Sequence, residues 1–357
     1  MATIKDIADR LNISISTVSK GLNGAPDISD ALRRSIIDTA VELGYKNSRT
    51  QKRGTRQMAV LIENMAYQAK GDFGYDILKG FETAALRLHW GVKVLPVTPE
   101  LQQKEKYEHF LLTHKCSGAC LLGFSLEDPW METLRTTTIP TSLLDNFIPV
   151  NPHVTCIGTD SEEGIDSAIA HLIALRHEKI AFLDGSPGSM ISDQRMLAYL
   201  SSMLARHLTV DPNFAIYSYF TPDAASYHVP GLVARGVTAI LCGSDLIASG
   251  VIKCCRELGY SVPEDISVIG FDDLPLAEHL DPPLTTIRQD RFELGKAGFF
   301  ALHTLTEHVP LSRTMLRPEL ILRSSTAIAR PRLAEPAEID RDSVLYRNPQ
   351  LYARLSR

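Results

Sequence analysis

The segment from Thr3 to Asn23, TIKDIADRLNISISTVSKGLN, constrains this chain most, because its pattern is typical of a helix-turn-helix. Thr3 is followed three residues later by Asp6, a capping-box spacing that predicts the start of a first helix. The apolar residues of that helix then fall on one stripe: Ile4, Ile7, Ala8 and Leu11. Asn12 follows where a tight turn is expected, and asparagine tolerates a left-handed backbone.

A second helix is predicted to begin after Ser14, with Val18 and Leu22 facing inward. Its outward side chains are short and polar, methyl-bearing or basic: Ile15, Ser16, Thr17, Ser19 and Lys20. Side chains of these kinds suit contacts with base edges and phosphates in a DNA major groove. The alternative is an ordinary helical hairpin, which would rarely place small polar residues in a row along its exposed side.

A third helix is predicted after Ser29, with Asp30 in its first turn and Gly44 just beyond its end. Its inner face is expected to consist of Leu32, Ile36, Ile37, Ala40 and Leu43. Asn23-Gly24 with Pro26 marks the loop between the second and third helices. Three short helices make a small core that is marginal unless attached to a larger body.

Charge supports a DNA-binding head. Residues 1–57 hold 10 Lys/Arg and 6 Asp/Glu, a net of +4, so the rest of this −5 chain carries −9. A run without acids follows the third helix and contains Lys46, Arg49, Lys52, Arg53 and Arg56. Such a run is either a solvated linker or, directly after a helix-turn-helix, a set of phosphate contacts. The candidate DNA contacts are Thr3, Ser14, Ile15, Ser16, Thr17, Ser19, Lys20, Asn23, Lys52 and Arg53.

Length and composition limit the domain organisation and the class of protein to expect. A chain of 357 residues suits a small head plus two medium lobes. No apolar run occupies the N-terminus and no stretch approaches the roughly 20 apolar residues of a membrane span, so we expect a cytoplasmic protein without a membrane partner, associated with the nucleoid when bound to DNA. The cysteines show no paired metal-ligand spacing, so we expect buried free thiols and no metal: Cys116, Cys120, Cys156, Cys242, Cys254 and Cys255.

From Gln57 onward, short apolar runs alternate with amphipathic helical stretches. The predicted strands are Met58–Glu63, Val92–Val97, Ala119–Leu122, Thr141–Leu144, Thr155–Gly158, Lys179–Leu183, Ala215–Tyr219, Ala239–Cys242, Ser267–Phe271 and Leu284–Ile287. The predicted helices are Ile77–Leu88, Glu162–Leu175, Gln194–Ala205, Ala224–Ala234, Ala248–Leu258 and Phe292–Thr304. This alternation predicts α/β architecture with parallel sheets, whose ligands bind beyond the carboxyl ends of the strands.

Polar and aromatic residues do follow several predicted strands. Asp72 and Phe73 lie in the loop after the first strand, Asp145 and Asp272 directly follow later strands, and Arg195 is expected at the start of a helix after a loop over 185–193. Carboxylates, an arginine and aromatic rings together suit a pocket that pairs hydroxyl groups and stacks on a sugar. For any single aspartate, and for Asp160 and Asp245 in particular, an Asx-turn or helix cap is the alternative.

Over residues 2–330 the chain resembles a transcriptional repressor of the lactose/galactose repressor family. The resemblance is carried by TIKDIADRL and SISTVSKGLNG at the N-terminus, then by DSEEG at 160–164, VIGFDD at 268–273 and PLTTIRQ at 283–289. It implies a helix-turn-helix head, a hinge and a periplasmic-binding-protein-like core of two Rossmann-like subdomains. It also implies a homodimer on a near-palindromic double-stranded operator, with a sugar or sugar derivative between the lobes changing DNA affinity.

The resemblance also assigns residues. It places base-reading positions on Ile15, Ser16 and Lys20, with Thr17 and Ser19 near the DNA backbone. Asp72 is added to the residues that the resemblance assigns, because it lies in the loop after the first predicted strand. The candidate ligand contacts are therefore Asp72, Phe73, Asp145, Arg195, Phe220, Ser244, Asp272 and Gln289. The expected divisions are a head at 1–45, a basic hinge at 46–57, a two-lobed core at 58–331 and a C-terminal tail at 332–357.

Two segments depart from or extend the family pattern. In the hinge, Asn47 stands at the usual proline and Gly54 at the leucine that wedges into the minor groove, so the basic run could replace the wedge. In the tail, Leu345, Tyr352 and Leu355 share one helical face, like the tetramerisation helix of some relatives. A loosely docked tail is favoured, because only about one heptad is apolar. A dimer is therefore expected, with a tetramer as the alternative.

Two other classes of protein use the same core. A sugar-transport protein would need a signal peptide and would lack a DNA-reading head. An enzyme would need a catalytic constellation, but no GxGxxG follows the first strand and no phosphate-binding P-loop occurs. We therefore expect no enzymatic activity, no catalytic residues and no cofactor.

Overall fold

The computed structural model describes residues 2–45 and 56–330. The chain divides into two compact units, each built from separate stretches of sequence. Unit 1 comprises Met1–Gly158 and Arg291–Thr314, and unit 2 comprises Thr159–Asp290 and Met315–Arg357. The polypeptide therefore passes from one unit to the other three times. Of the predicted hinge at 46–57, residues 46–55 lie outside the described residues, whereas Arg56 and Gln57 belong to the first strand. The predicted tail at 332–357 also lies outside the described residues.

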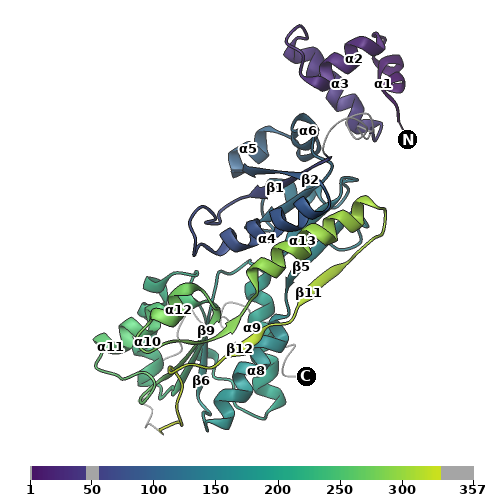
Figure 1. Ribbon diagram of the computed structural model, residues 1–357. Coiled ribbons are helices and arrows are strands. Elements are labelled where there is room, and N and C mark those ends of the chain that lie inside the picture. Colours follow the sequence, from purple (N-terminus) through teal and green to yellow (C-terminus); the bar gives the residue numbers. More distant parts are fainter. Residues whose placement is uncertain (1, 46–55, 331–357) are drawn as a thin grey trace. The chain divides into compact units, whose positions relative to one another are not determined.

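The N-terminal helices form as the caps predict: α1 (Ile4–Leu11), α2 (Ile15–Asn23) and α3 (Asp30–Glu42). Figure 1 shows the three helices packed together. The buried core of the head consists of Ile7, Ala8, Val18, Ile36, Ala40 and Tyr45. Asn12 has the left-handed φ of 53° that the turn between α1 and α2 needs. Two expectations here are wrong. Leu43 is exposed because α3 ends one residue before it, and Tyr45 completes the core instead. Asn23 is the last residue of α2, so the loop begins at Gly24.

Unit 1 contains a sheet with the strand order β11-β5-β4-β3-β1-β2. Pairings among β1 to β5 are parallel, with Val60 opposite both Val94 and Cys120. Its strands are β1 (Arg56–Ile62), β2 (Trp90–Pro96), β3 (Ala119–Leu122), β4 (Thr141–Leu144), β5 (Val154–Thr159) and β11 (Arg313–Leu316). Its helices after the head are α4 (Phe73–Arg87), α5 (Pro99–Lys104), α6 (Tyr107–Thr113), α7 (Pro129–Thr133) and α13 (Arg291–Thr306).

Unit 2 contains a second sheet, with the order β12-β10-β9-β8-β6-β7. Its strands run parallel except that β12 is antiparallel to β10. The strands are β6 (Ile180–Asp184), β7 (Ala215–Tyr217), β8 (Ala239–Cys242), β9 (Ser267–Asp272), β10 (Thr285–Arg288) and β12 (Glu319–Ile321). The helices are α8 (Ser161–Ala174), α9 (Met190–Ala205), the 3-10 turn Pro212–Phe214, α10 (Pro222–Ala234), α11 (Asp245–Glu257) and α12 (Pro275–His279).

In unit 1, helices α4 and α13 lie side by side although their sequences are far apart (Figure 1). Glycines permit this contact. A Cβ on Gly80 of α4 would lie 1.9 Å from the carbonyl oxygen of Phe292, and one on Gly295 of α13 would lie 1.9 Å from that of Ile77. Both glycines thus let one helix backbone approach the other directly.

Every strand predicted from an apolar run is present, and the predicted α/β class with mainly parallel sheets is confirmed. The sequence reading missed the short elements α5, α6, α7, α12, β11 and β12. The loop expected over 185–193 is shorter, because α9 already begins at Met190. All cysteines are buried and free. Within residues 2–45 and 56–330, no helix is both long enough and apolar enough to cross a membrane.

Candidate functional site

The first candidate site is the exposed side of α2 in the head. The helix begins because the Ser14 hydroxyl accepts a 3.0 Å hydrogen bond from the Thr17 backbone nitrogen. Ile15 is 49% exposed, and Ser16 and Lys20 are also exposed, whereas Thr17 and Ser19 are half-buried. The predicted base-reading residues therefore share one exposed surface, and the two predicted backbone contacts lie at its margin.

Two other candidate DNA contacts, Thr3 and Asn23, form hydrogen bonds within the head. Thr3 and Asp6 form the predicted capping box, with the Thr3 nitrogen donating to Asp6 Oδ2 at 2.7 Å and the Asp6 nitrogen to Thr3 Oγ1 at 3.3 Å. The hydrogen bond from the Thr3 backbone lowers the pKa of Asp6. Asn23 donates through Nδ2 to the Ser19 carbonyl oxygen at 2.8 Å.

Lys20 forms an ion pair with Asp27, which follows α2. Both side chains are about half exposed, so water screens the attraction and a DNA phosphate can compete for the ammonium group. The remaining candidate DNA contacts, Lys52 and Arg53, lie outside the described residues.

The second candidate site lies at strand ends, and unit 1 holds three of its predicted residues. Asp72 is the N-cap of α4, and its Oδ2 accepts a 2.8 Å hydrogen bond from the Ala69 nitrogen. Phe73 begins α4 and packs partly buried against the core of unit 1. Asp145 follows β4 with a left-handed φ of 58°, held by a 2.8 Å bond from its nitrogen to the Ile157 oxygen. These residues stay predictions.

Unit 2 brings the remaining predicted residues to one edge of its sheet. Because β6, β8, β9 and β10 are parallel, their carboxyl ends share that edge, and Asp184, Ser244, Asp272 and Gln289 lie on or just beyond them. Asp272 has a left-handed φ of 108° and accepts a 2.6 Å hydrogen bond from Gln289 Nε2. Both side chains are buried, and Gln289 Oε1 has no hydrogen-bond partner within the described chain.

Arg195 lies in α9 and is buried at the same edge. Its Nη1 donates to the Gly243 carbonyl oxygen at 2.7 Å, and its guanidinium lies 3.8 Å from the centre of the Phe271 ring. Phe220 is half-buried nearby: a Cβ on Gly185 would lie 2.0 Å from its ring and 2.5 Å from Ser192 Oγ. The structure thus gathers Arg195, Phe220, Asp272 and Gln289 around the strand ends of unit 2.

Asp245 has a role that differs from the cap considered for it, because its neighbour Ser244 caps α11. Ser244 caps α11 by accepting a 3.2 Å bond from the Ile247 nitrogen, whereas Asp245, considered as a cap, is fully buried. The Asp245 carboxylate instead accepts hydrogen bonds of 2.6 Å from the Leu274 nitrogen and the Thr286 hydroxyl. Burial, and next the charge of Asp272, raise the pKa of Asp245 well above its ordinary value. The suggestion that Asp160 is a cap is confirmed, since it accepts from the Glu163 nitrogen at 3.1 Å.

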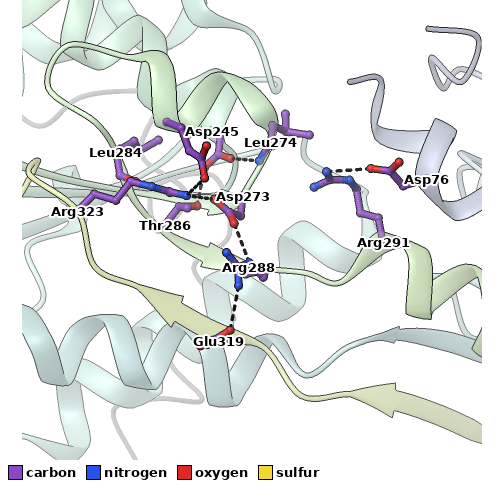
Figure 2. Close-up of polar contacts among 11 residues, drawn as sticks. Asp76, Asp245, Asp273, Leu274, Leu284, Thr286, Arg288, Arg291, Glu319 and Arg323 are labelled. Atoms are coloured by element: carbon purple, nitrogen blue, oxygen red, sulfur yellow. Dashed lines mark hydrogen bonds and ion pairs between the residues drawn. The ribbon is translucent and has the colours of Figure 1, made fainter. Parts of the chain in front are cut away.

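A network that sequence reasoning missed surrounds Asp245 and Asp273 (Figure 2). Asp273 accepts from Arg288 Nε at 2.7 Å and forms a 2.8 Å ion pair with Arg323. Arg288 also bonds Glu319 of β12 at 3.1 Å. This network ties β9, β10 and β12 together and so fixes the turn that carries Asp272. In unit 1, Arg291 and Asp76 join α13 to α4 by a 3.2 Å ion pair, also drawn in Figure 2.

In the part of the chain that the structure describes, His, Cys, Asp and Glu side chains form no group of three or more that could hold a metal ion.

Both the head and the α/β core match known protein families. Residues 3–48 match the model described as bacterial regulatory proteins, lacI family, and residues 169–326 match a periplasmic binding protein-like domain. The chain is 28% identical to the HTH-type transcriptional repressor CytR of Escherichia coli (strain K12), over 91% of this chain and 96% of that protein. It is 29% identical to the HTH-type transcriptional regulator MalR of Streptomyces coelicolor, over 91% of this chain and 97% of that protein.

Solved structures agree in fold. A complex of the transcriptional regulator CelR with cellobiose aligns with a TM-score of 0.68 at 24% identity, covering 91% of this chain and 100% of that one. The lac repressor dimer bound to operator and the anti-inducer ONPF aligns with a TM-score of 0.64 at 23% identity, covering 91% and 99%. The relatives are named regulators and repressors, which are not enzymes. A helix-turn-helix head of the matched type, the periplasmic-binding-protein-like core and relatives aligned along nearly their whole length together make this chain a member of the lacI family of bacterial regulatory proteins, a DNA-binding transcriptional regulator.

Proposed function

We propose that the protein is a repressor that binds a near-palindromic operator as a homodimer and releases or tightens it when a sugar binds to its α/β core. The observation that carries the proposal is α2, a capped helix with Ile15, Ser16 and Lys20 exposed on one side. Each head would read one half-site, so a two-fold operator follows from a two-fold dimer. Since its partner is DNA, we place the protein in the cytoplasm, at the nucleoid.

The strand ends of unit 2 support a sugar as the proposed class of effector. Arg195, Asp272 and Gln289 offer donors and acceptors, and Phe220 offers an aromatic ring, which together suit a hydroxylated ring compound. Cellobiose, which the CelR complex contains, is a compound of this class and the first member of the panel we would test. Asp72, Phe73, Asp145 and Ser244 remain proposed contacts, and a dimer rather than a tetramer remains the proposed assembly.

DNA reading is tested by Lys20→Ala. Loss of one phosphate or base contact per head should weaken operator binding by about 1–3 kcal/mol per contact and flatten the slope of log affinity against log salt by roughly 0.9 per lost phosphate contact. Fluorescence anisotropy with an operator fragment across several salt concentrations measures both. Lys5→Ala is the matched control, because Lys5 is an exposed lysine on α1 outside the candidate set. Equal losses for Lys5→Ala and Lys20→Ala would contradict the assignment of α2 as the reading helix.

Effector binding is tested by Arg195→Lys, which keeps the charge but removes the planar fork of donors. We expect at least a tenfold loss of effector affinity, about 1.4 kcal/mol, in thermal-shift titrations with the sugar panel, and unchanged operator affinity without sugar. Asp193→Asn, an exposed change on the same helix, should retain the effector response. If Arg195→Lys lost operator binding and sugar binding together, general misfolding would be the explanation.

A further inference from the structure

Asp184 is a buried carboxyl group that the proposed function does not use. It ends β6 and is completely inaccessible to solvent. Its Oδ1 accepts a 2.7 Å hydrogen bond from the Gly185 nitrogen, whereas its Oδ2 has no hydrogen-bond partner among the described residues. A buried carboxyl oxygen without a partner is costly, so a nearby charge is the first compensation to look for.

That charge is Arg195, and Gly243 brings the two groups together. Arg195 donates to the Gly243 carbonyl oxygen at 2.7 Å, and a Cβ on Gly243 would lie 2.3 Å from Asp184 Oδ1. Position 243 therefore requires a glycine, because a side chain there would collide with Asp184 while the carbonyl group of the same residue accepts from Arg195. Burial raises the pKa of Asp184 to about 7, and the positive charge of Arg195 opposes this rise.

Asp193 and Tyr217 also interact electrostatically with Asp184. Asp193 is exposed, accepts a 2.9 Å hydrogen bond from the Tyr217 hydroxyl, and raises the pKa of Asp184 further. Burial, and next the charge of Asp193, raise the pKa of Tyr217, which keeps that hydroxyl neutral. On its other sides the Arg195 guanidinium meets the Phe271 ring and Ser161 Oγ, which is 3.5 Å away. Asp184 is thus a buried acid that interacts electrostatically with the Arg195 guanidinium.

We propose that Asp184 is the counter-charge of Arg195 and thereby restricts the effector to uncharged, hydroxylated molecules. A buried guanidinium without a counter-charge binds phosphate, sulfate and carboxylate groups strongly through paired hydrogen bonds. With the Asp184 carboxylate beside it, an anion gains little net attraction and is repelled by the acid. Hydroxyl groups are uncharged and both donate and accept hydrogen bonds, so the Asp184 carboxylate does not weaken their binding. The inference rests on the proposed role of Arg195 in effector binding, and Asp184 acts through Arg195 as a positioning residue.

The test uses inorganic sulfate as the probe, because its charge is constant between pH 6 and pH 8. Sulfate binding to the full-length protein is measured by isothermal titration at constant ionic strength. At pH 8 we expect Asp184→Asn to bind sulfate at least tenfold more tightly than the wild type. Ser192→Ala, which alters a neighbouring buried but uncharged side chain, and Asp184→Glu, which restores the carboxyl group, should both behave like the wild type.

A pH profile separates the charge from a purely structural role. As pH falls from 8 to 6, Asp184 becomes protonated, so sulfate affinity of the wild type should rise toward that of Asp184→Asn, whose own profile should be flat. The double variant Asp184→Asn/Arg195→Gln controls for sulfate bound elsewhere, and it should not show the increase in sulfate affinity expected for Asp184→Asn. Equal sulfate affinities of wild type and Asp184→Asn at pH 8, or parallel pH profiles, would overturn the proposal. The assay contains neither DNA nor sugar, so failure of the regulatory function would appear separately, in the operator and sugar titrations.

Discussion

Gly295→Ala and Gly80→Ala should each lower the free energy of unfolding of unit 1 by about 3 kcal/mol, at the upper end of the range for overpacked sites. The added Cβ would lie 1.9 Å from a main-chain carbonyl oxygen of the facing helix, and no side-chain rotation can relieve that contact. Helices α4 and α13 must therefore move apart, which opens the core around Phe81 and Phe299, whose rings meet edge to face at 5.5 Å. A shift of the unfolding midpoint by roughly 6–12 °C in calorimetry would report this loss.

The control is Gly231→Ala in α10. There the nearest atom to an added Cβ is the Nη1 of Arg235, 3.2 Å away at the end of a flexible side chain. Alanine is a better helix former than glycine by about 1 kcal/mol, so this variant should be neutral or more stable. If Gly295→Ala and Gly80→Ala melted at the wild-type temperature, the direct backbone contact between α4 and α13 would be disproved.

Asp184→Asn should change how stability depends on pH. The pKa of Asp184 is raised from its ordinary 3.8 to about 7 in the folded protein, so the folded state holds a proton that the unfolded state has released. The contribution of Asp184 to the free energy of unfolding is therefore most favourable at low pH. It declines as pH rises from about 4 to about 7 and is constant above that. At 1.36 kcal/mol per pH unit, the decline amounts to roughly 4 kcal/mol in order of magnitude.

Urea unfolding at several pH values between 4 and 8 measures this effect as the difference between variants. Asp184→Asn should lack the decline, whereas Asp193→Asn, which removes an exposed acid nearby, should keep it. Using the difference cancels the contributions of other raised carboxyl groups such as Glu63, whose pKa burial raises to about 8. Parallel curves for wild type and Asp184→Asn would show that Asp184 is charged in the folded protein throughout this range.

The elements that could be predicted from sequence are those with a local cause. Ala119–Leu122 and Ala239–Cys242 are apolar runs buried on both faces of a parallel sheet, and their bounds agree with β3 and β8. The caps Thr3 and Ser14 lie at expected positions because capping depends only on residues three apart. By contrast β12 is antiparallel, short and partly exposed, and Glu319–Ile321 contains only two apolar residues, too few to predict a strand.

The candidate site was predictable only in part, because burial and charge pairing depend on distant neighbours. Asp245 and Ser244 are adjacent at the start of α11, and sequence alone cannot tell which one caps the helix and which one is buried against Thr286. The environment of Asp184 depends on Arg195 and on Gly243, at the end of another strand. No spacing rule contains these contacts. Lys52 and Arg53 remain predictions from charge alone.

The three passages of the chain between the units have a consequence for synthesis on the ribosome. Phe299 and Leu302 of α13 belong to the same apolar core as Met58 and Val60 of β1. The core of unit 1 therefore remains incomplete after residues 1–158 have been synthesised, until all of 159–290 and then α13 have been translated. Contacts this far apart in sequence form slowly, and exposed apolar strands are sites of aggregation in the meantime. A nascent chain halted before Arg291 should consequently expose the α13-binding face of unit 1 and be the form most dependent on chaperones.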